Sequence, residues 1–319
     1  MATIETFPVQ SEVRGPWRRF IDDLVPLRPD LFRYCCGLTG NVWDGEDLAQ
    51  DTLLRVFGHL GKINADLENP RAYLIRSATH LWIDRVRRAG VERRLAKDQV
   101  DSAPAVADDD PSQVMAVREA AASLFGNLSP QERASVLLKD VLDFSLEETA
   151  AMLKTTVGAV KSALHGGRAR LRAAKDAPVA ACSVPRGLVD RFVAALNAQD
   201  LDAIRALCLA DVTVDMVGGA CFESWEEGKI TLEYAHMVIP ALGMGADPRW
   251  IEVDYRGEPI AVGLRTKDDL EGINEIWRLE ADDGRLSRIR LYCFTPDLLR
   301  AVGRDLGLPA APRPYRSPP

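Results

Sequence analysis

The chain has 319 residues, of which 47% are hydrophobic and 27% are charged, and its formal net charge is −7 at pH 7. This composition is that of an ordinary folded protein, so disorder is not the expected state of the whole chain. The excess of acid argues against a protein that coats nucleic acid unaided, because such a protein needs a positive surface. The length predicts about two to three domains.

The sequence contains no apolar run long enough to cross a bilayer, and its N-terminus lacks the basic start and apolar core of a secretory signal. We therefore expect no membrane partner. The six cysteines are scattered without a C-x-x-C pair, which favours reduced thiols in a cytoplasm. Four widely spaced histidines and the lack of a glycine-rich phosphate loop predict neither a metal nor a cofactor.

Residues 1–97 have the pattern of a helical module. Apolar periodicity predicts helices at 17–24 and 30–38, a third helix capped by Asp44, and a fourth that begins at Asn69-Pro70. The third helix has an apolar stripe and a polar face, which consists of Asp47, Gln50, Asp51 and Arg55. The fourth helix is basic, because residues 71–97 hold eight basic residues and two acidic ones. Such a local excess of positive charge predicts a nucleic-acid surface.

A stretch rich in Asp, Ala and Pro separates this module from a second one. Residues 98–113 lack apolar periodicity and are expected to form a flexible acidic linker. Helices resume over residues 114–176, where Ser129, Pro130 and Glu132 stand in the order of a helix start with a capping box.

Residues 146–172 predict a helix-turn-helix. Ser145 and Glu148 can form a capping box for its first helix, and Lys154 and Thr155 form the turn. The second helix starts with small residues followed by basic ones, which suits insertion into a major groove. The alternative is an ordinary helical hairpin with a solvated basic face. The candidate DNA-binding residues here are Thr156, Val157, Gly158, Ala159, Lys161, Ser162, His165 and Arg168.

From about residue 185 the pattern becomes α+β. Helices are expected at 188–197, 201–208 and 226–238, and strands at 212–216, 250–255, 260–266, 274–280 and 286–294, which predicts a mostly antiparallel sheet. This domain would span residues 185–306, before a proline-rich tail at 307–319. Candidate pocket residues are Asp215, Trp225, His236, Tyr255, Arg265, Trp277 and Tyr292. An enzyme would use Asp215 or His236 as acid or base; the alternative is that all seven are ordinary strand and helix residues.

The order of these parts resembles a bacterial sigma factor of the extracytoplasmic-function class. Residues 44–55 and 69–88 resemble the domain that binds RNA polymerase and reads the −10 promoter element, and residues 128–133 and 157–162 resemble the domain that reads the −35 element. The resemblance implies two all-α sigma domains, core polymerase as partner through its clamp helices and flap, and promoter DNA. It places the clamp helices on the polar face of the third helix.

The same resemblance assigns the −10 element to the fourth helix. Phosphates would meet Arg71, Arg76, Arg87 and Arg88, and bases would meet Asn69, Thr79 and His80. Relatives commonly carry asparagine at the position of His80, and arginines at the positions of Ala163 and Gly166. Gly166 and Gly167 lie inside the predicted recognition helix, where each glycine costs about 1 kcal/mol relative to alanine. We therefore expect a softer helix end and weaker −35 binding.

The remainder of the chain resembles the SnoaL-like cone, a curved sheet wrapped by helices around a pocket. This resemblance implies a domain that tunes the activity of the sigma domains, with a small-molecule ligand as one candidate signal. The resemblance to a sigma factor implies that the chain itself performs no chemistry. Two other functions stay open at this point. One is a stand-alone helix-turn-helix regulator, and the other is an enzyme or sensor that uses the C-terminal domain.

Overall fold

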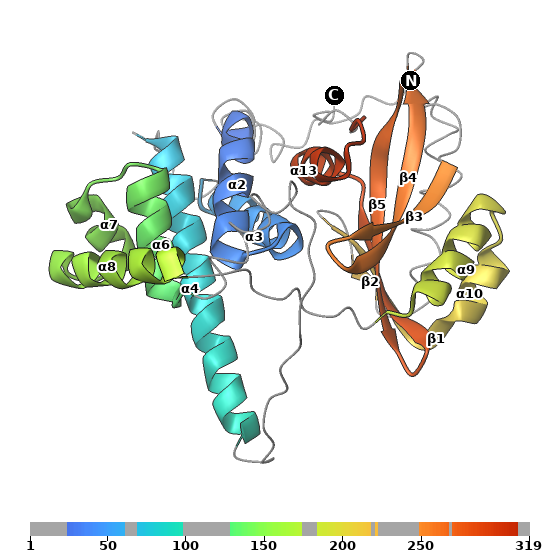
Figure 1. The fold of residues 1–319 in the computed structure, drawn as a ribbon, viewed down its shortest axis with the longest axis horizontal. Helices are drawn as coiled ribbons and strands as arrows, with labels where there is room; N and C mark the ends of the chain where they lie inside the picture. The colour runs from blue at the N-terminus through green and yellow to red at the C-terminus, as the bar shows by residue number, and fades with distance from the viewer. Residues whose placement is uncertain are drawn as a thin grey trace, which may run out of the picture. The chain divides into compact units, whose positions relative to one another are not determined.

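The computed structural model describes residues 24–60, 69–97, 128–173, 184–217, 221–222, 249–267 and 270–311 (Figure 1). They belong to two compact units, Met1–Pro178 and Val179–Pro319. The predicted linker at 98–113, the predicted helix at 226–238 and nearly all of the helix at 17–24 lie outside the described residues.

Three helices form the first part of unit one, after a short 3-10 turn at Val25–Leu27. They are α2 (Arg28–Thr39), α3 (Val42–Leu60) and α4 (Pro70–Lys97). Gly40 ends α2 with φ of 88°, a left-handed conformation that glycine adopts without strain. The start of α3 corrects the prediction that Asp44 is its cap. The side chain of Asn41 accepts a hydrogen bond from the Asp44 backbone N–H at 2.8 Å, so Asn41 is the capping residue and Asp44 lies in the first turn.

A glycine sets how closely α2 and α3 approach. A Cβ atom on Gly45 would lie 2.6 Å from the Cys36 sulfur and 2.8 Å from the Cys36 Cα. Beside this contact the helices share an apolar core, to which Leu38, Leu48, Leu74 and other residues contribute side chains that are fully buried or nearly so. Arg28 and Glu46 form an ion pair within the same region, with 4% and 0% of their side chains exposed.

The second part of unit one is the predicted helix-turn-helix. It consists of α6 (Pro130–Val136), a π-helical turn η3 (Leu137–Val141), α7 (Leu146–Leu153) and α8 (Val157–Ala173). Both predicted capping boxes are present, at Ser129 with Glu132 and at Ser145 with Glu148. Lys154 makes the turn with φ of 52°. The Thr156 hydroxyl accepts from the Ala159 N–H at 3.2 Å, which confirms the predicted cap of α8.

The two helical modules share one core. Ala134, Leu137, Leu138 and Met152 of the second module belong to the same buried cluster as the side chains of α2, α3 and α4. Arg133 joins them as well, because its Nη1 donates to the Leu38 carbonyl at 2.7 Å and its guanidinium lies 5.8 Å from the centre of the Trp82 ring. A smaller cluster of Leu128, Val136, Ala150, Val160 and Leu164 is internal to the second module.

Unit two is α+β, as predicted. Helices α9 (Arg186–Asn197) and α10 (Leu201–Leu207) precede a sheet with strand order β2-β1-β6-β5-β4-β3. Among the strand pairs that the structure describes, only β1–β6 is parallel. The strands are β1 (Cys208–Met216), β2 (Cys221–Phe222), β3 (Arg249–Tyr255), β4 (Glu258–Lys267), β5 (Leu270–Asp282) and β6 (Arg285–Tyr292).

The core of unit two lies between one face of this sheet and α9. Phe192 of α9 is fully buried against Trp277, whose ring centroid is 5.7 Å away, and Trp250 meets Trp277 edge-on at 4.9 Å. The sequence patterns do not predict α13 (Pro296–Leu306), which buries Leu298, Leu299 and Val302. The predicted tail is held at its start, because the N–H of Ala311 donates to the Ile273 carbonyl at 2.8 Å.

Candidate nucleic-acid and polymerase interfaces

The polar face of α3 is present but partly engaged by its neighbours. Asp51 forms an ion pair with Arg85 of α4, and Gln50 donates to Glu46 at 2.8 Å. Arg55 is exposed and Asp47 is half-buried. Leu54, which is 67% exposed on the same helix, is not among the residues predicted from the sequence. Helical spacing is the signal that could have identified it, because Leu54 follows Gln50 by four residues and Asp51 by three and so belongs to the same face. An apolar side chain within a polar rim is typical of interfaces.

The proposed −10 residues of α4 have different surroundings. Arg76, Arg87 and Arg88 are exposed, whereas Arg71 is half-buried and lies 3.4 Å from Asp30. The Asn69 side chain caps α4 by accepting from the Ala72 N–H at 2.9 Å. Thr79 must be removed from the set of base-contacting residues. It is fully buried, and its hydroxyl bonds the Tyr34 hydroxyl and the Ile75 carbonyl, both at 2.7 Å.

His80 contacts the second helical module rather than solvent alone. Its Nε2 lies 2.8 Å from the Met152 carbonyl oxygen at the end of α7. Burial is the main cause that lowers the pKa of His80, nearby Lys154 and Arg76 lower it further, and the hydrogen bond to Met152 opposes them. In this arrangement the predicted base-reading side chain is engaged by the module predicted to read the other promoter element.

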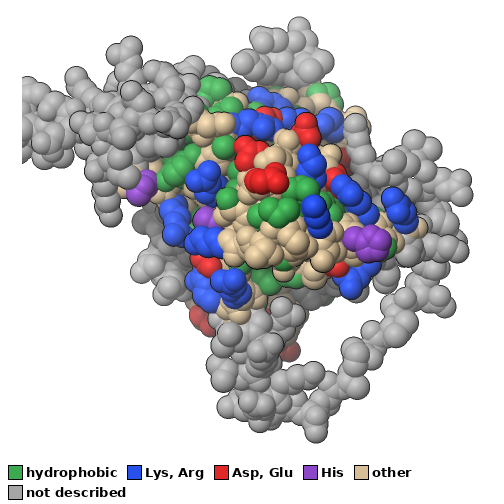
Figure 2. All heavy atoms as spheres, turned by 90° about the vertical axis from the view of Figure 1, so that its left-hand side faces the viewer, with side chains coloured by type: hydrophobic (Ala, Val, Ile, Leu, Met, Phe, Trp, Pro, Cys, Tyr) green, Lys and Arg blue, Asp and Glu red, His purple; other side chains and the backbone are tan. Residues whose placement is uncertain are grey.

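The recognition helix α8 presents the predicted DNA residues to solvent. Thr156, Gly158, Lys161, Ser162, His165 and Arg168 are exposed, and Val157 and Ala159 are half-buried. Figure 2 looks onto the face that carries α7 and α8, where Lys and Arg side chains surround a small group of acidic ones. A groove of about 440 Å³ runs beside α8 and is lined by Lys139, Leu146, Lys161, Leu164, His165, Arg168, Ala169 and Arg172. Lys139, which reaches this groove from η3, is not among the residues predicted from the sequence.

The two glycines inside α8 have a packing role that the sequence did not reveal. A Cβ on Gly167 would lie 3.1 Å from the Val136 Cγ2, and one on Gly166 would lie 2.6 Å from the Glu132 Oε1. Glu132 also accepts from the Ser129 N–H at 2.9 Å and pairs with Arg170. The glycines thus let α6 and its cap lie close against α8, which remains helical through both of them to Ala173.

The structure divides the described members of the predicted C-terminal pocket between the two faces of the sheet. Asp215 is opposite Arg290 in the sheet, and Tyr292 follows two residues later, while Trp277 is opposite Leu291. Because side chains alternate along strands, Asp215 and Tyr292 lie on one face and Trp277 on the other. Trp225 and His236 lie outside the described residues.

Polar partners are present for Asp215, Tyr255, Arg265 and Trp277, and the last two share the carboxylate of Glu275. Asp215 pairs with Arg288 at 2.7 Å, and the Tyr255 hydroxyl donates to Asp305 of α13 at 2.8 Å. Arg265 and Glu275 are an almost fully buried pair at 3.8 Å, and the Trp277 Nε1 donates to Glu275 at 3.3 Å. No cluster of metal-binding side chains occurs within the described part of the chain. Among the helices that the structure describes, none combines the length and apolarity of a membrane span.

Comparisons with known proteins agree with this architecture. Residues 25–91 match the family model for Sigma-70 region 2, and residues 118–171 match that for Sigma-70, region 4. The ECF RNA polymerase sigma factor SigG of Mycobacterium tuberculosis is 28% identical over 304 residues, with 85% of this chain and 80% of the relative covered.

Two further comparisons differ in how much of the chain they cover. The RNA polymerase sigma-E factor of Streptomyces avermitilis is 34% identical over 156 residues, which cover 47% of this chain and 82% of the relative. The crystal structure of the Mycobacterium tuberculosis extracytoplasmic function sigma factor SigJ aligns with 87% of this chain and 97% of its own, at 21% identity and a TM-score of 0.34. The chain belongs to the extracytoplasmic-function family of bacterial RNA polymerase sigma factors, which direct promoter-specific initiation of transcription.

Proposed function

We propose that α4 holds the −10 element and α8 reads the −35 element, while the polar face of α3 docks on the clamp helices of core polymerase and the second module meets the flap. The observation that carries this division is the exposure of Lys161, Ser162 and His165 on the N-terminal half of α8. Side chains at these positions of a recognition helix contact base edges in the major groove. The factor itself performs no chemistry and acts in the cytoplasm, where the polymerase is.

The two modules pack against each other, and this packing conflicts with simultaneous binding to both promoter elements. The names of the two elements place them about 25 base pairs apart, which is about 85 Å at ~3.4 Å per base pair. Modules whose atoms touch at His80 and Met152 cannot occupy both elements at once. Promoter binding therefore requires that α4 separate from α7, and the polymerase supplies the surfaces that hold the modules apart.

We infer that unit two regulates this activity rather than catalysing a reaction. The candidate acid Asp215 pairs with Arg288 and lies on the opposite face of the sheet from Trp277, which supports a structural role for both. A chain that ends before Pro185 should initiate transcription at the same promoters with a changed output. Unchanged output would argue against regulation by unit two.

Run-off transcription with purified core polymerase and host promoter DNA tests the main proposal. Wild type should initiate at defined sites, and Lys161→Ala should lose output at promoters that depend on the −35 element. Arg191→Ala is the matched control, because it removes an exposed cation from α9 instead. If Lys161→Ala and Arg191→Ala behave alike, α8 does not read the promoter. If the chain binds DNA specifically without polymerase and never initiates, it acts as a stand-alone regulator.

A further inference from the structure

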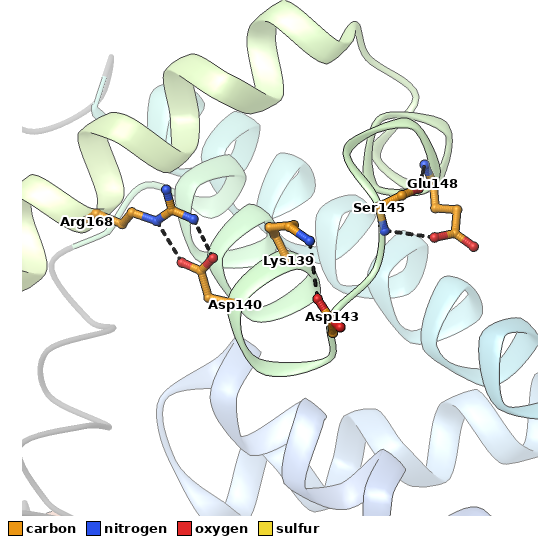
Figure 3. A network of polar contacts seen from close by, with 6 residues as sticks. All are labelled: Lys139, Asp140, Asp143, Ser145, Glu148 and Arg168. Carbon is orange, nitrogen blue, oxygen red and sulfur yellow. Dashed lines mark hydrogen bonds and ion pairs between the residues drawn. The ribbon is translucent and has the colours of Figure 1, made fainter.

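Two aspartates form ion pairs with cationic side chains of the groove beside α8. Lys139, Lys161, Arg168 and Arg172 give it four cationic side chains. The π-helical turn η3 supplies Asp140, and the following loop supplies Asp143, whose φ of 58° is a left-handed conformation that Asp tolerates better than most residues. Figure 3 shows both aspartates pointing toward cations of the groove. The recognition surface therefore contains its own competitors for the cations that would bind phosphate.

The two acid–cation pairs differ in quality. Arg168 donates twice to Asp140, from Nε at 2.9 Å and from Nη2 at 2.5 Å, and this pairing raises the pKa of Arg168 above its ordinary value. Lys139 makes a single contact to Asp143 at 3.2 Å, and the Asp143 side chain is 95% exposed. A bidentate pair holds its arginine in a fixed geometry, whereas a single exposed contact is screened by water and salt. Asp140 is thus the acidic residue that can neutralise a cation of the groove, because it holds Arg168 through two hydrogen bonds.

We propose that Asp140 sets the DNA affinity of the second helical module by neutralising Arg168. A phosphate that approached Arg168 would also meet the Asp140 carboxylate, so this arginine adds little to the attraction of the backbone. Among the described residues, Lys161 and Arg172 have no ion-pair partner, and they would carry most of the phosphate contact. This inference rests on the proposed function of α8, and it makes Asp140 an affinity-setting residue that acts through Arg168.

The test measures binding of the full chain to a labelled duplex that carries the −35 element alone, which the exposed α8 can reach in the closed form, over a range of salt concentrations. Asp140→Asn should bind about 3- to 10-fold more tightly at low salt, and the slope of log K against log salt should steepen by about 0.9, the value for one added phosphate contact. Asp143→Asn should change binding by less than about 2-fold, because its pair is already screened. Elution from heparin gives a second reading with a simple polyanion.

Two controls separate a freed arginine from a general change in charge. Glu147→Gln removes the same charge from the exposed first turn of α7 without releasing an ion-paired cation, so its salt slope should remain that of wild type. Arg168→Ala should abolish the gain of Asp140→Asn, because no arginine is then left to be freed, and a double-mutant cycle measures this coupling. Each variant is used only after its thermal unfolding midpoint has been compared with that of wild type.

Three results would overturn the inference. Asp140→Asn could bind no more tightly than wild type, it could bind less tightly because Asp140 aims Arg168 at a phosphate, or Glu147→Gln could match it. The failure of the proposed function looks different, since wild type would then not initiate transcription with core polymerase. If wild type initiates and Lys161→Ala loses output at promoters that depend on the −35 element, the proposed function holds. The salt slopes alone then decide the inference about Asp140.

Discussion

At the scale of single residues, Gly45 determines whether α2 and α3 can cross. An alanine there would place its Cβ 2.8 Å from the Cys36 Cα, a backbone atom that cannot rotate away. We expect Gly45→Ala to lower the free energy of unfolding by about 2–3 kcal/mol, as other overpacked core sites do. Gly58→Ala in the same helix is the matched control, because nothing lies within 4 Å of its added Cβ. It should be neutral or stabilising by up to ~1 kcal/mol. Urea unfolding measures both, and equal effects would contradict the close crossing.

His80 gives a pH dependence with a defined sign. Its pKa in the folded chain is below the ordinary 6.5, so the unfolded chain binds the proton more readily. The free energy of unfolding should therefore fall as the pH drops below about 6.5, because protonation draws the chain toward the unfolded state. His80→Gln should remove this part of the pH dependence, and His165→Gln on exposed α8 should keep it. Urea titrations at several pH values compare the three proteins, and an unchanged profile for His80→Gln would refute the assignment.

At the scale of elements, the capping box of α6 stabilises two helices. Glu132 caps α6 and also pairs with Arg170 of the recognition helix α8. Burial alone would raise the pKa of Glu132, but hydrogen bonds from Ser129 and the charge of Arg170 lower it below its ordinary value. Its carboxylate stabilises the fold above about pH 4.5, and this contribution is lost as the pH falls through the folded pKa.

Two substitutions test this cap. Ser129→Ala should lower the free energy of unfolding by about 1 kcal/mol at neutral pH. Glu132→Gln should unfold with less dependence on pH below 4.5 than wild type. Thermal unfolding between pH 3 and 7 provides the measurement for both. If Glu132→Gln keeps the full acid sensitivity of wild type, another carboxylate is responsible for it.

The sequence predicted elements best where the signal is local. Both capping boxes, the turn at Lys154 and the main strands of unit two follow from short patterns, and the structure confirms them. Prediction from the sequence failed where the role of a residue depends on a partner that is distant in the sequence. Gly166 and Gly167 read as a weakness of α8 because Glu132 and Val136, which lie against them, are about 30 residues away in sequence. Grouping Asp215 with Trp277 failed because only the strand register shows which face each occupies.

At the scale of the whole first unit, Arg133 holds the two modules together. Its hydrogen bond to the Leu38 carbonyl and its position over Trp82 both cross the boundary between the modules, and burial lowers its pKa. Arg133→Ala should lower the free energy of unfolding by about 2 kcal/mol, the usual contribution of a charged hydrogen bond. Hydrogen exchange should quicken in α2, α4 and α6 and remain unchanged in α9. Arg76→Ala, an exposed cation of α4, is the control. Protection equal to wild type in Arg133→Ala would argue against this role.

The core shared by the two modules also sets a condition on how long a separated form can survive. Leu138 is fully buried, and Met152 and Trp82 are only 3% and 6% exposed. Separation of the two modules would therefore expose an apolar interface to water. Bare apolar surface of this kind promotes self-association. A chain whose modules separate in the absence of polymerase should therefore aggregate in a concentration-dependent way. Molecules released after initiation should stay monomeric only if their modules close again faster than two such molecules collide.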